Sequence, residues 1–212
     1  MGLQNLGGIG NLTVLPAGGR PEDTFAFDTG PGNMVMDQLT ERMTGGEKRF
    51  DQNGEMAARG RVSEPLLQWM LRDPYLKKAQ PKTTGREAYG SDYVNRLLRE
   101  AEEYRLLPED ILATATRFTA ACVGVAVRDF CAVKPELLVA GGGGCRNATL
   151  MDDLRQELGV PVLTNEDLGL DSDAKEAVAF AVLANECIHG NPNNLPSVTG
   201  AGHPVVMGKI SL

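Results

Sequence analysis

Three glycine-rich turns, each after a probable strand, are the feature that most constrains how this 212-residue chain folds. They lie at residues 7–10, 30–32 and 141–144. An apolar run closed by glycines is typical of a strand that ends in a tight turn. Because ligands of open α/β sheets bind beyond the carboxyl ends of strands, three such turns in one domain predict a shared cleft for an anionic ligand.

Apolar periodicity and turn signals predict an alternating order of elements along the chain. The expected strands are a hairpin over 3–15, then 24–30, 136–140 and 160–165. The expected helices are 32–46, 63–76, 91–106, 108–130, 147–159 and 172–190. The last helix is apolar all round over 177–184, so we expect that part to be buried. This order predicts an α/β domain whose sheet is antiparallel on one side and parallel on the other.

The net charge and the spacing of the cysteines exclude several classes of protein. The formal net charge of −7 argues against a nucleic-acid-binding surface and against docking on an anionic membrane. The four cysteines lack CxxC spacing, which is typical of reduced thiols in a cytoplasmic protein. We expect no apolar run to approach the length that spans a bilayer. The two histidines have no visible partners for a metal site.

The acid at the end of the third strand, Asp28, allows two interpretations. It either makes an Asx-turn in the Thr29–Asn33 loop, or it is held at the strand end to act on a ligand. The glycine turns also have plain alternatives. Residues 7–10 suit a hairpin turn, and 141–144 suit a tight strand-to-helix connection with Asn147 as the N-cap. Glu176 is either an acid favoured by a helix dipole or a functional residue.

Six sequence blocks, taken together, resemble a known family. They are "NLGGIGNLTVLP", "FDTGPGN" followed by "MD", "PKTTGRE", "GGGGCRNATLMDDL", "KEAVAFAVLA" and "PSVTGA". In this order, from residue 4 to residue 201, they are similar to the anhydro-N-acetylmuramic acid kinases of the actin-like, sugar-kinase and heat-shock-protein ATPase superfamily. The resemblance implies an actin-like (ribonuclease H-like) ATPase half-domain with a mixed five-stranded sheet in the order β-β-β-α-β-α-β-α.

The resemblance also implies an activity. Such kinases use ATP and Mg²⁺ to phosphorylate O6 of 1,6-anhydro-N-acetylmuramic acid while water opens the anhydro ring, giving N-acetylmuramic acid 6-phosphate in cell-wall recycling. Asp28 is then the general base on that water, and Gly30, Asn33 and Glu176 contact the sugar. The residues implied in nucleotide binding are Gly7, Gly8, Gly10 and Asn11 in a phosphate loop, and Gly141, Gly142, Gly143 and Asn147 in an adenosine loop.

Family members have two actin-like halves that clamp ATP, and the G-T-S-x-D-G loop of the first half has no counterpart here. We therefore expect residues 1–212 to form a single C-terminal actin-like domain with a helical insertion over 46–107. Its expected partners are ATP, the anhydro sugar, and a missing N-terminal half-domain or partner chain. Two alternatives stay open: a non-catalytic binding or assembly module that forms homo-oligomers, and another sugar kinase of the superfamily.

Overall fold

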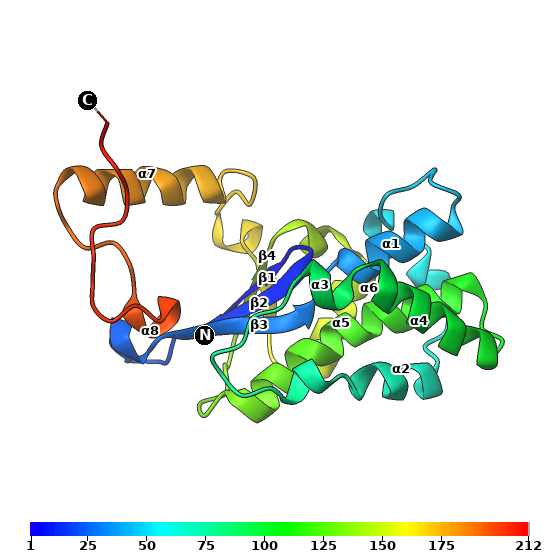
Figure 1. Cartoon of the computed structure of the whole chain (residues 1–212). Helices are drawn as coiled ribbons and strands as arrows, with labels where there is room; N and C mark the ends of the chain where they lie inside the picture. Colours follow the sequence, from blue (N-terminus) through cyan, green and yellow to red (C-terminus); the bar gives the residue numbers. More distant parts are fainter. Residues whose placement is uncertain (212) are drawn as a thin grey trace.

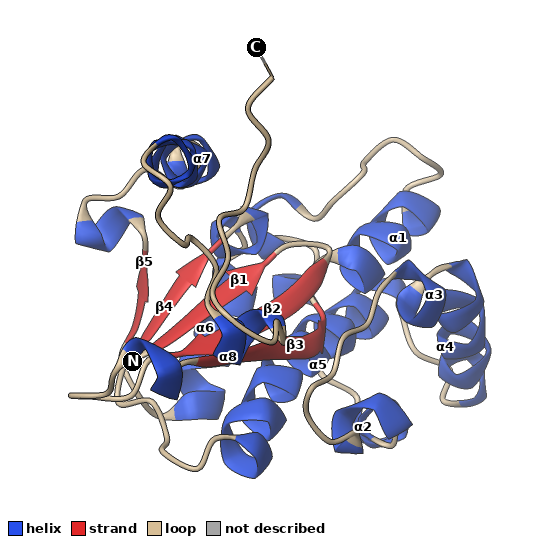
Figure 2. Ribbon diagram, turned by 60° about the vertical axis from the view of Figure 1, so that its left-hand side comes forward, coloured by secondary structure: helices blue, strands red, loops and turns tan. Residues whose placement is uncertain are grey.

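The computed structural model describes residues 1–211, which fold around one mixed sheet of five strands in the order β3-β2-β1-β4-β5 (Figure 2). The strands are β1 (Gly2–Leu6), β2 (Ile9–Val14), β3 (Phe25–Pro31), β4 (Leu138–Gly141) and β5 (Val162–Thr164). The β1–β2 and β2–β3 pairs are antiparallel, whereas β1–β4 and β4–β5 are parallel. The mixed sheet expected from the sequence is confirmed.

Strand direction places the three glycine turns at one edge of this sheet. Because β2 is antiparallel to both of its neighbours, β3 runs in the same direction as β1, β4 and β5. The glycine turns follow the carboxyl ends of β1, β3 and β4, so all three lie on the side where α/β sheets bind ligands.

The helices follow the predicted order. They are α1 (Met34–Met43), α2 (Glu64–Leu71), α3 (Arg86–Tyr89), α4 (Ser91–Glu103), α5 (Pro108–Phe130), α6 (Ala148–Leu158), α7 (Lys175–Ile188) and α8 (Pro196–Thr199). Reduced to its main elements, the order is β-β-β-α-β-α-β-α, so the predicted order of elements is confirmed. Residues 46–107 contribute α2, α3 and α4 together with short 3₁₀ turns. That they are an insertion stays a prediction.

Helix α5 is the centre of the hydrophobic core (Figure 1). Pro108 opens the helix, and Glu109 and Asp110 place negative charge at its N-terminus, where the helix dipole favours it. It packs against α2, α6 and β3, and Leu112 and Phe118 are fully buried. Within residues 1–211 it is the one helix long and apolar enough to span a membrane, which the sequence did not lead us to expect. Most of its length is buried, so core packing accounts for its apolar composition.

The two faces of the sheet differ in how well they are covered. Along β1, Leu6 is fully buried, whereas Leu3, which points to the other face, is 37% exposed. The helices α5 and α6 pack together and cover the first face (Figure 2). On the other face, α8 contacts β3 near its start.

The prediction that residues 177–184 are buried is wrong. Val178, Phe180 and Val182 of α7 are 60%, 71% and 55% exposed, and α7 stands away from the sheet (Figure 1). The C-terminal tail runs beside α7, where Asn193 Nδ2 donates a hydrogen bond to the Leu183 carbonyl at 3.0 Å. An apolar helix signals that a partner surface exists, but the pattern cannot say whether that surface lies in the same chain.

Replacing Leu112 with alanine should lower the free energy of unfolding by roughly 2–5 kcal/mol, since the side chain is fully buried on α5. The control is Leu107→Ala at the N-cap of the same helix. Leu107 is 64% exposed, so its loss should cost no more than about 0.5 kcal/mol. Urea unfolding measures both, and equal costs would contradict the placement of α5.

Candidate functional site

The first two glycine turns are hydrogen-bonded to each other. The amides of Gly32 and Met34 donate to the Gly8 carbonyl at 3.0 and 3.1 Å, and the Asn33 amide donates to the Gly7 carbonyl at 2.7 Å. A Cβ atom at Gly32 would overlap the Gly7 carbonyl oxygen. The β3–α1 turn therefore lies directly on the β1–β2 turn, and only glycine fits at position 32.

The third glycine turn reaches the same point from β4. Gly142 has a φ of +89°, and a Cβ there would lie 2.9 Å from the Leu6 carbonyl oxygen. A Cβ at Gly144 would lie 2.9 Å from Asn33 Oδ1, and Asn33 Nδ2 itself donates to the Leu6 carbonyl at 3.3 Å. The structure thus brings Gly7, Gly8, Asn33 and the 141–144 turn together around the end of β1.

Gly10, Asn11 and Gly30 belong to the pairing of β2 with β3. Gly10 lies opposite Gly30 and Asn11 lies opposite Asp28, so Thr29 is an extra residue in a β-bulge. A Cβ at Gly10 would come within 2.6 Å of Thr29 Oγ1, so glycine at position 10 leaves room for the bulge. A bulge bends its strand and re-aims the neighbouring side chains, here at the strand end that carries Asp28.

The Asp28 carboxylate is held by the 81–87 segment, "PKTTGRE". Thr83 Oγ1 and the Thr84 amide both donate to Asp28 Oδ2, at 2.7 and 2.9 Å. Tyr75 Oη donates to the Asp28 carbonyl at 2.8 Å. Within residues 1–211 the carboxylate makes no hydrogen bond to the Gly30 amide, so the Asx-turn interpretation is wrong. Sequence reasoning did not identify Thr83 and Thr84, and the only signal was that their block belongs to the resemblance.

The structural roles expected for the 7–10 turn, as a hairpin connection, and for the 141–144 turn, as a strand-to-helix connection, are both present. Gly7 and Gly8, with Ile9, connect Leu6 and Gly10, the last residue pair of the β1–β2 hairpin. Asn147 Oδ1 accepts a hydrogen bond from the Leu150 amide at 2.9 Å and caps α6. Asn147 is 8% exposed, which matches a cap built into the fold.

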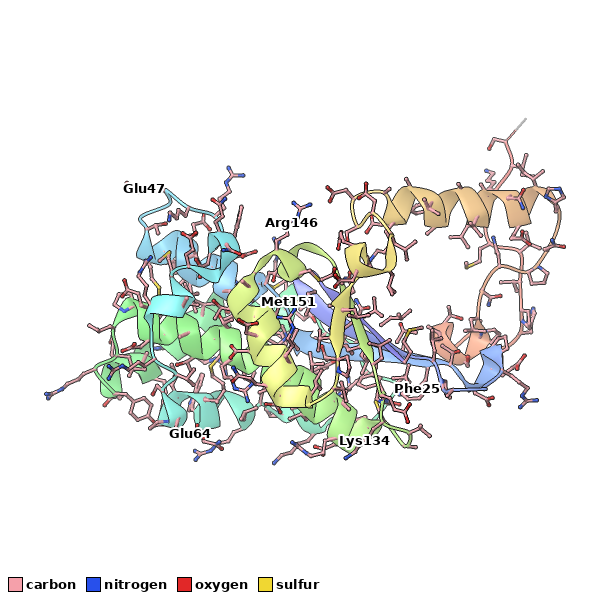
Figure 3. The ribbon with its side chains drawn as sticks, turned by 180° about the vertical axis from the view of Figure 1, so that it is seen from behind. Phe25, Glu47, Glu64, Lys134, Arg146 and Met151 are labelled. Atoms are coloured by element: carbon pink, nitrogen blue, oxygen red, sulfur yellow. The ribbon has the colours of Figure 1, made fainter. Side chains whose placement is uncertain are left out.

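A cavity of about 510 Å³ opens beside the 141–147 turn. It is bounded by that turn, by α1 and by the 50–53 segment, and its lining includes Asn33, Asp37, Phe50, Gln52, Gly143, Gly144, Arg146 and Asn147. Figure 3 shows Arg146 projecting from the turn that precedes α6. The size is that of a small-molecule site, and the lining combines an aromatic ring with charged and amide groups.

The first turn of α7 also approaches the site. Lys175 Nζ donates to Asn5 Oδ1 at 3.3 Å, at the end of β1, and this cation was missed by sequence reasoning. Glu176, its neighbour, is exposed, and among the described residues no hydrogen bond or ion pair links it to Asp28. Its position in the first turn of α7 suits the helix dipole.

Within residues 1–211 no three side chains of histidine, cysteine, aspartate or glutamate lie close enough together to hold a metal ion. Mg²⁺ usually keeps several waters and is bound through one or two carboxylates together with substrate phosphates, so it does not require such a cluster.

Asp37 lines the cavity, and burial raises its pKa from 3.8 to about 6. The folded state therefore holds a proton that the unfolded chain releases at lower pH. Asp37 contributes stability at low pH, and this contribution is lost as pH rises from about 4 to about 6. With allowance for its partial exposure, we expect a loss of about 1–2 kcal/mol.

Asp37→Asn should remove this loss, so that the free energy of unfolding falls less between pH 4 and pH 7 than in the wild type. Urea unfolding at several pH values measures it. The exposed Asp92→Asn on α4 is the matched control and should reproduce the wild-type curve. An Asp37→Asn curve parallel to that of the wild type would contradict the assignment.

The family model "Anhydro-N-acetylmuramic acid kinase" matches residues 2–212. A protein of that name from Caldanaerobacter subterraneus subsp. tengcongensis is 52% identical over 213 residues, covering 99% of this chain and 54% of the relative. One from Salinibacter ruber is 47% identical, covering 100% of this chain and 53% of the relative, and one from Bacillus cereus strain AH187 is 43% identical.

Among solved structures, the activator of 2-hydroxyisocaproyl-CoA dehydratase from Clostridium difficile with bound ADPNP aligns at a TM-score of 0.47 and 14% identity, over 77% of this chain and 53% of that one. That likeness is too distant to support an argument. The family assignment depends on the curated relatives instead. This chain spans about half of their length. The match over residues 2–212 and the identities of up to 52% show that the chain belongs to the anhydro-N-acetylmuramic acid kinase family.

Proposed function

We propose that this domain is the ATP- and sugar-binding C-terminal half of an anhydro-N-acetylmuramic acid kinase. The observation that carries the proposal is the Asp28 carboxylate, fixed at the end of β3 by Thr83 and Thr84 on the sheet edge where the three glycine turns meet. A base that is held at a strand end beside a backbone-lined anion site suits a reaction that pairs a water attack with phosphoryl transfer.

In the proposed reaction Asp28 takes a proton from water as the water oxygen bonds to the anomeric carbon of the anhydro sugar. The bond between that carbon and O6 breaks, and O6 bonds to the γ-phosphorus of ATP, with ADP as the leaving group. Asp28 Oδ2 already accepts two hydrogen bonds, whereas Oδ1 has no partner among residues 1–211. Oδ1 is therefore the oxygen that we assign to the water.

We assign the nucleoside part of ATP to the 510 Å³ cavity beside the 141–147 turn. Phe50 offers a ring that a base can stack on, and Arg146 offers a cation. The phosphates would then extend toward the Gly7–Gly8 turn, which lies against Asn33. Backbone amides of glycine turns suit phosphoryl oxygens, because this transfer needs placed dipoles rather than a covalent intermediate.

The decisive experiment is reconstitution. This chain is mixed with a separately produced N-terminal half of a family member, Mg-ATP and 1,6-anhydro-N-acetylmuramic acid, and formation of the 6-phosphate is followed by mass spectrometry. We expect product only when both halves are present, since the glycine turns form one wall of the site. If neither the mixture nor the chain alone forms product, the proposed function is wrong.

In the reconstituted enzyme Asp28→Asn should lower kcat by roughly 10²–10⁴-fold, because the water loses its base. The affinity for ATP, measured by calorimetry, should stay within about twofold, since the substitution keeps the shape and removes only the charge. Asp92→Asn on α4 is the control and should keep full turnover. Full turnover by Asp28→Asn would refute its role as base.

The exposed apolar residues of α7 favour a partner for this chain. We propose that Phe180, which is 71% exposed and lies on the opposite side of α7 from Val178 and Val182, packs against the other half-domain, because the chain spans about half of its relatives and this side chain has no cover among residues 1–211. Interfaces between domains of one protein typically bury about 600–1,500 Å², which an apolar helix face helps to supply. Self-association of the isolated chain would instead favour the assembly-module alternative.

Phe180→Ser should weaken binding of the N-terminal half at least about tenfold, as expected for a central aromatic contact worth more than about 1.4 kcal/mol. Binding is measured by calorimetry, and sedimentation reports self-association. Val133→Ser is the control, because Val133 is 60% exposed and precedes β4 away from α7. Unchanged affinity in Phe180→Ser would exclude this face.

A further inference from the structure

Lys82 is a buried lysine that the function described above does not use. Its residue is 5% exposed, and it lies in the 81–87 segment between the 3₁₀ turn Pro74–Lys77 and α3. Among residues 1–211 no carboxylate lies within 4.0 Å of its ammonium group. Its one hydrogen bond is long, to the Leu76 carbonyl at 3.5 Å. A buried charge without an ion pair is costly and calls for an explanation.

Three aromatic rings surround the ammonium group. Nζ lies 3.8 Å from the centroid of the Phe130 ring, 5.0 Å from that of Tyr75 and 5.5 Å from that of Phe27. Each distance is within the range of a cation–π contact, which strengthens when the cation is desolvated. We name these three residues the aromatic cage.

No buried anion adjoins this cation. Burial raises the pKa of the Cys122 thiol well above its usual value, so Cys122 stays neutral. Burial lowers the pKa of Lys82, and the negative charge of Asp129 opposes that shift. The faces of the aromatic cage are therefore the main compensation for the buried charge.

Two members of the aromatic cage, and Lys82 itself, are linked directly to Asp28. Phe27 directly precedes Asp28 on β3, and Tyr75 Oη donates to the Asp28 carbonyl at 2.8 Å. The Asp28 amide donates to the carbonyl of Lys82 itself at 3.3 Å. The two residues after Lys82 are Thr83 and Thr84, whose hydroxyl and amide donate to Asp28 Oδ2. The ammonium group is thus the anchor of the segment that holds the carboxylate.

We propose that Lys82 is a positioning residue for Asp28: its ammonium group, inserted in the aromatic cage, fixes the 81–84 segment so that Thr83 and Thr84 hold Oδ2 and direct Oδ1 toward substrate. The inference rests on the proposed function, because it takes Asp28 as the base. A methionine could fill the same volume, so packing alone does not require a lysine here. The charge adds an attraction to three rings that belong to different elements: Phe27 on β3, Phe130 on α5 and Tyr75 in the 74–77 turn.

The first test is hydrogen exchange by NMR on this chain, comparing the wild type with Lys82→Met. The Thr84 amide should exchange about tenfold faster in the variant, as its hydrogen bond to Asp28 loosens. Amides of β1 should keep their rates, which separates local loosening from global destabilisation. Lys78→Met is the matched control, an exposed lysine four residues earlier. The proposal would be overturned if the exchange rate of the Thr84 amide did not change, or if it rose only by the same factor as the rates of the β1 amides.

Phe130→Leu is the second variant, should Lys82→Met not fold. It removes the nearest ring face and keeps an apolar side chain, so it should accelerate Thr84 exchange as Lys82→Met does. Unchanged Thr84 exchange in Phe130→Leu would also overturn the proposal.

The second test uses the reconstituted enzyme. Lys82→Met should lower kcat about tenfold or more, with the KM for ATP within about twofold, whereas a purely structural role would lower the amount of folded enzyme and leave kcat per folded molecule intact. Wild-type halves that form no product, with Thr84 exchange accelerated in Lys82→Met, would refute the proposed function and support the anchoring by Lys82. Product formation with normal kcat in Lys82→Met would refute the positioning role of Lys82 and leave the proposed function intact.

Discussion

The close approach of the 31–34 turn to the Gly7–Gly8 turn is the constraint on which the site depends. Three amides of the later turn donate to two carbonyls of the earlier one, and Gly32 leaves no space for a side chain. This contact fixes the end of β3 against the end of β1. It also orders Asn33, through which the 141–144 turn joins the same cluster. The site is therefore backbone packed on backbone, which explains why glycines dominate it.

The reacting end of the site is built differently, from side chains far apart in sequence. Asp28 ends a strand, but its carboxylate is fixed by residues more than fifty positions later, and those residues are fixed by a lysine among three aromatic rings. Polar groups buried at a site need compensation, and here hydrogen bonds and ring faces provide it. This division between a part lined by backbone and a part held by side chains is compatible with the proposed function, which pairs phosphoryl transfer with the attack of water.

Helices α5 and α7 are both apolar but differ in how far they are buried. Helix α5 lies in the core, with α1, α2, α6, β2 and β3 among the elements that pack on it, and its burial is complete at Leu112 and Phe118. Helix α7 has an equally apolar middle and stands in solvent, with Phe180 71% exposed. Burial depends on which surfaces meet, so the apolar pattern of residues 177–184 led to a wrong prediction of burial. The half-length of the chain relative to its family is consistent with a partner surface for α7.

The sequence alone determined the element order, the mixed sheet and the clustering of the glycine turns at one edge, because alternation and turn residues are local properties and the connections between elements restrict how strands pair. It also identified Asp28 as a strand-end acid and the family to which the chain is similar. Tertiary structure alone decided that Thr83 and Thr84 hold Asp28, that Lys82 sits among Phe27, Tyr75 and Phe130, and that α7 is uncovered. The physical reason is that these contacts join segments distant in the chain, and their geometry depends on packing that no local pattern encodes.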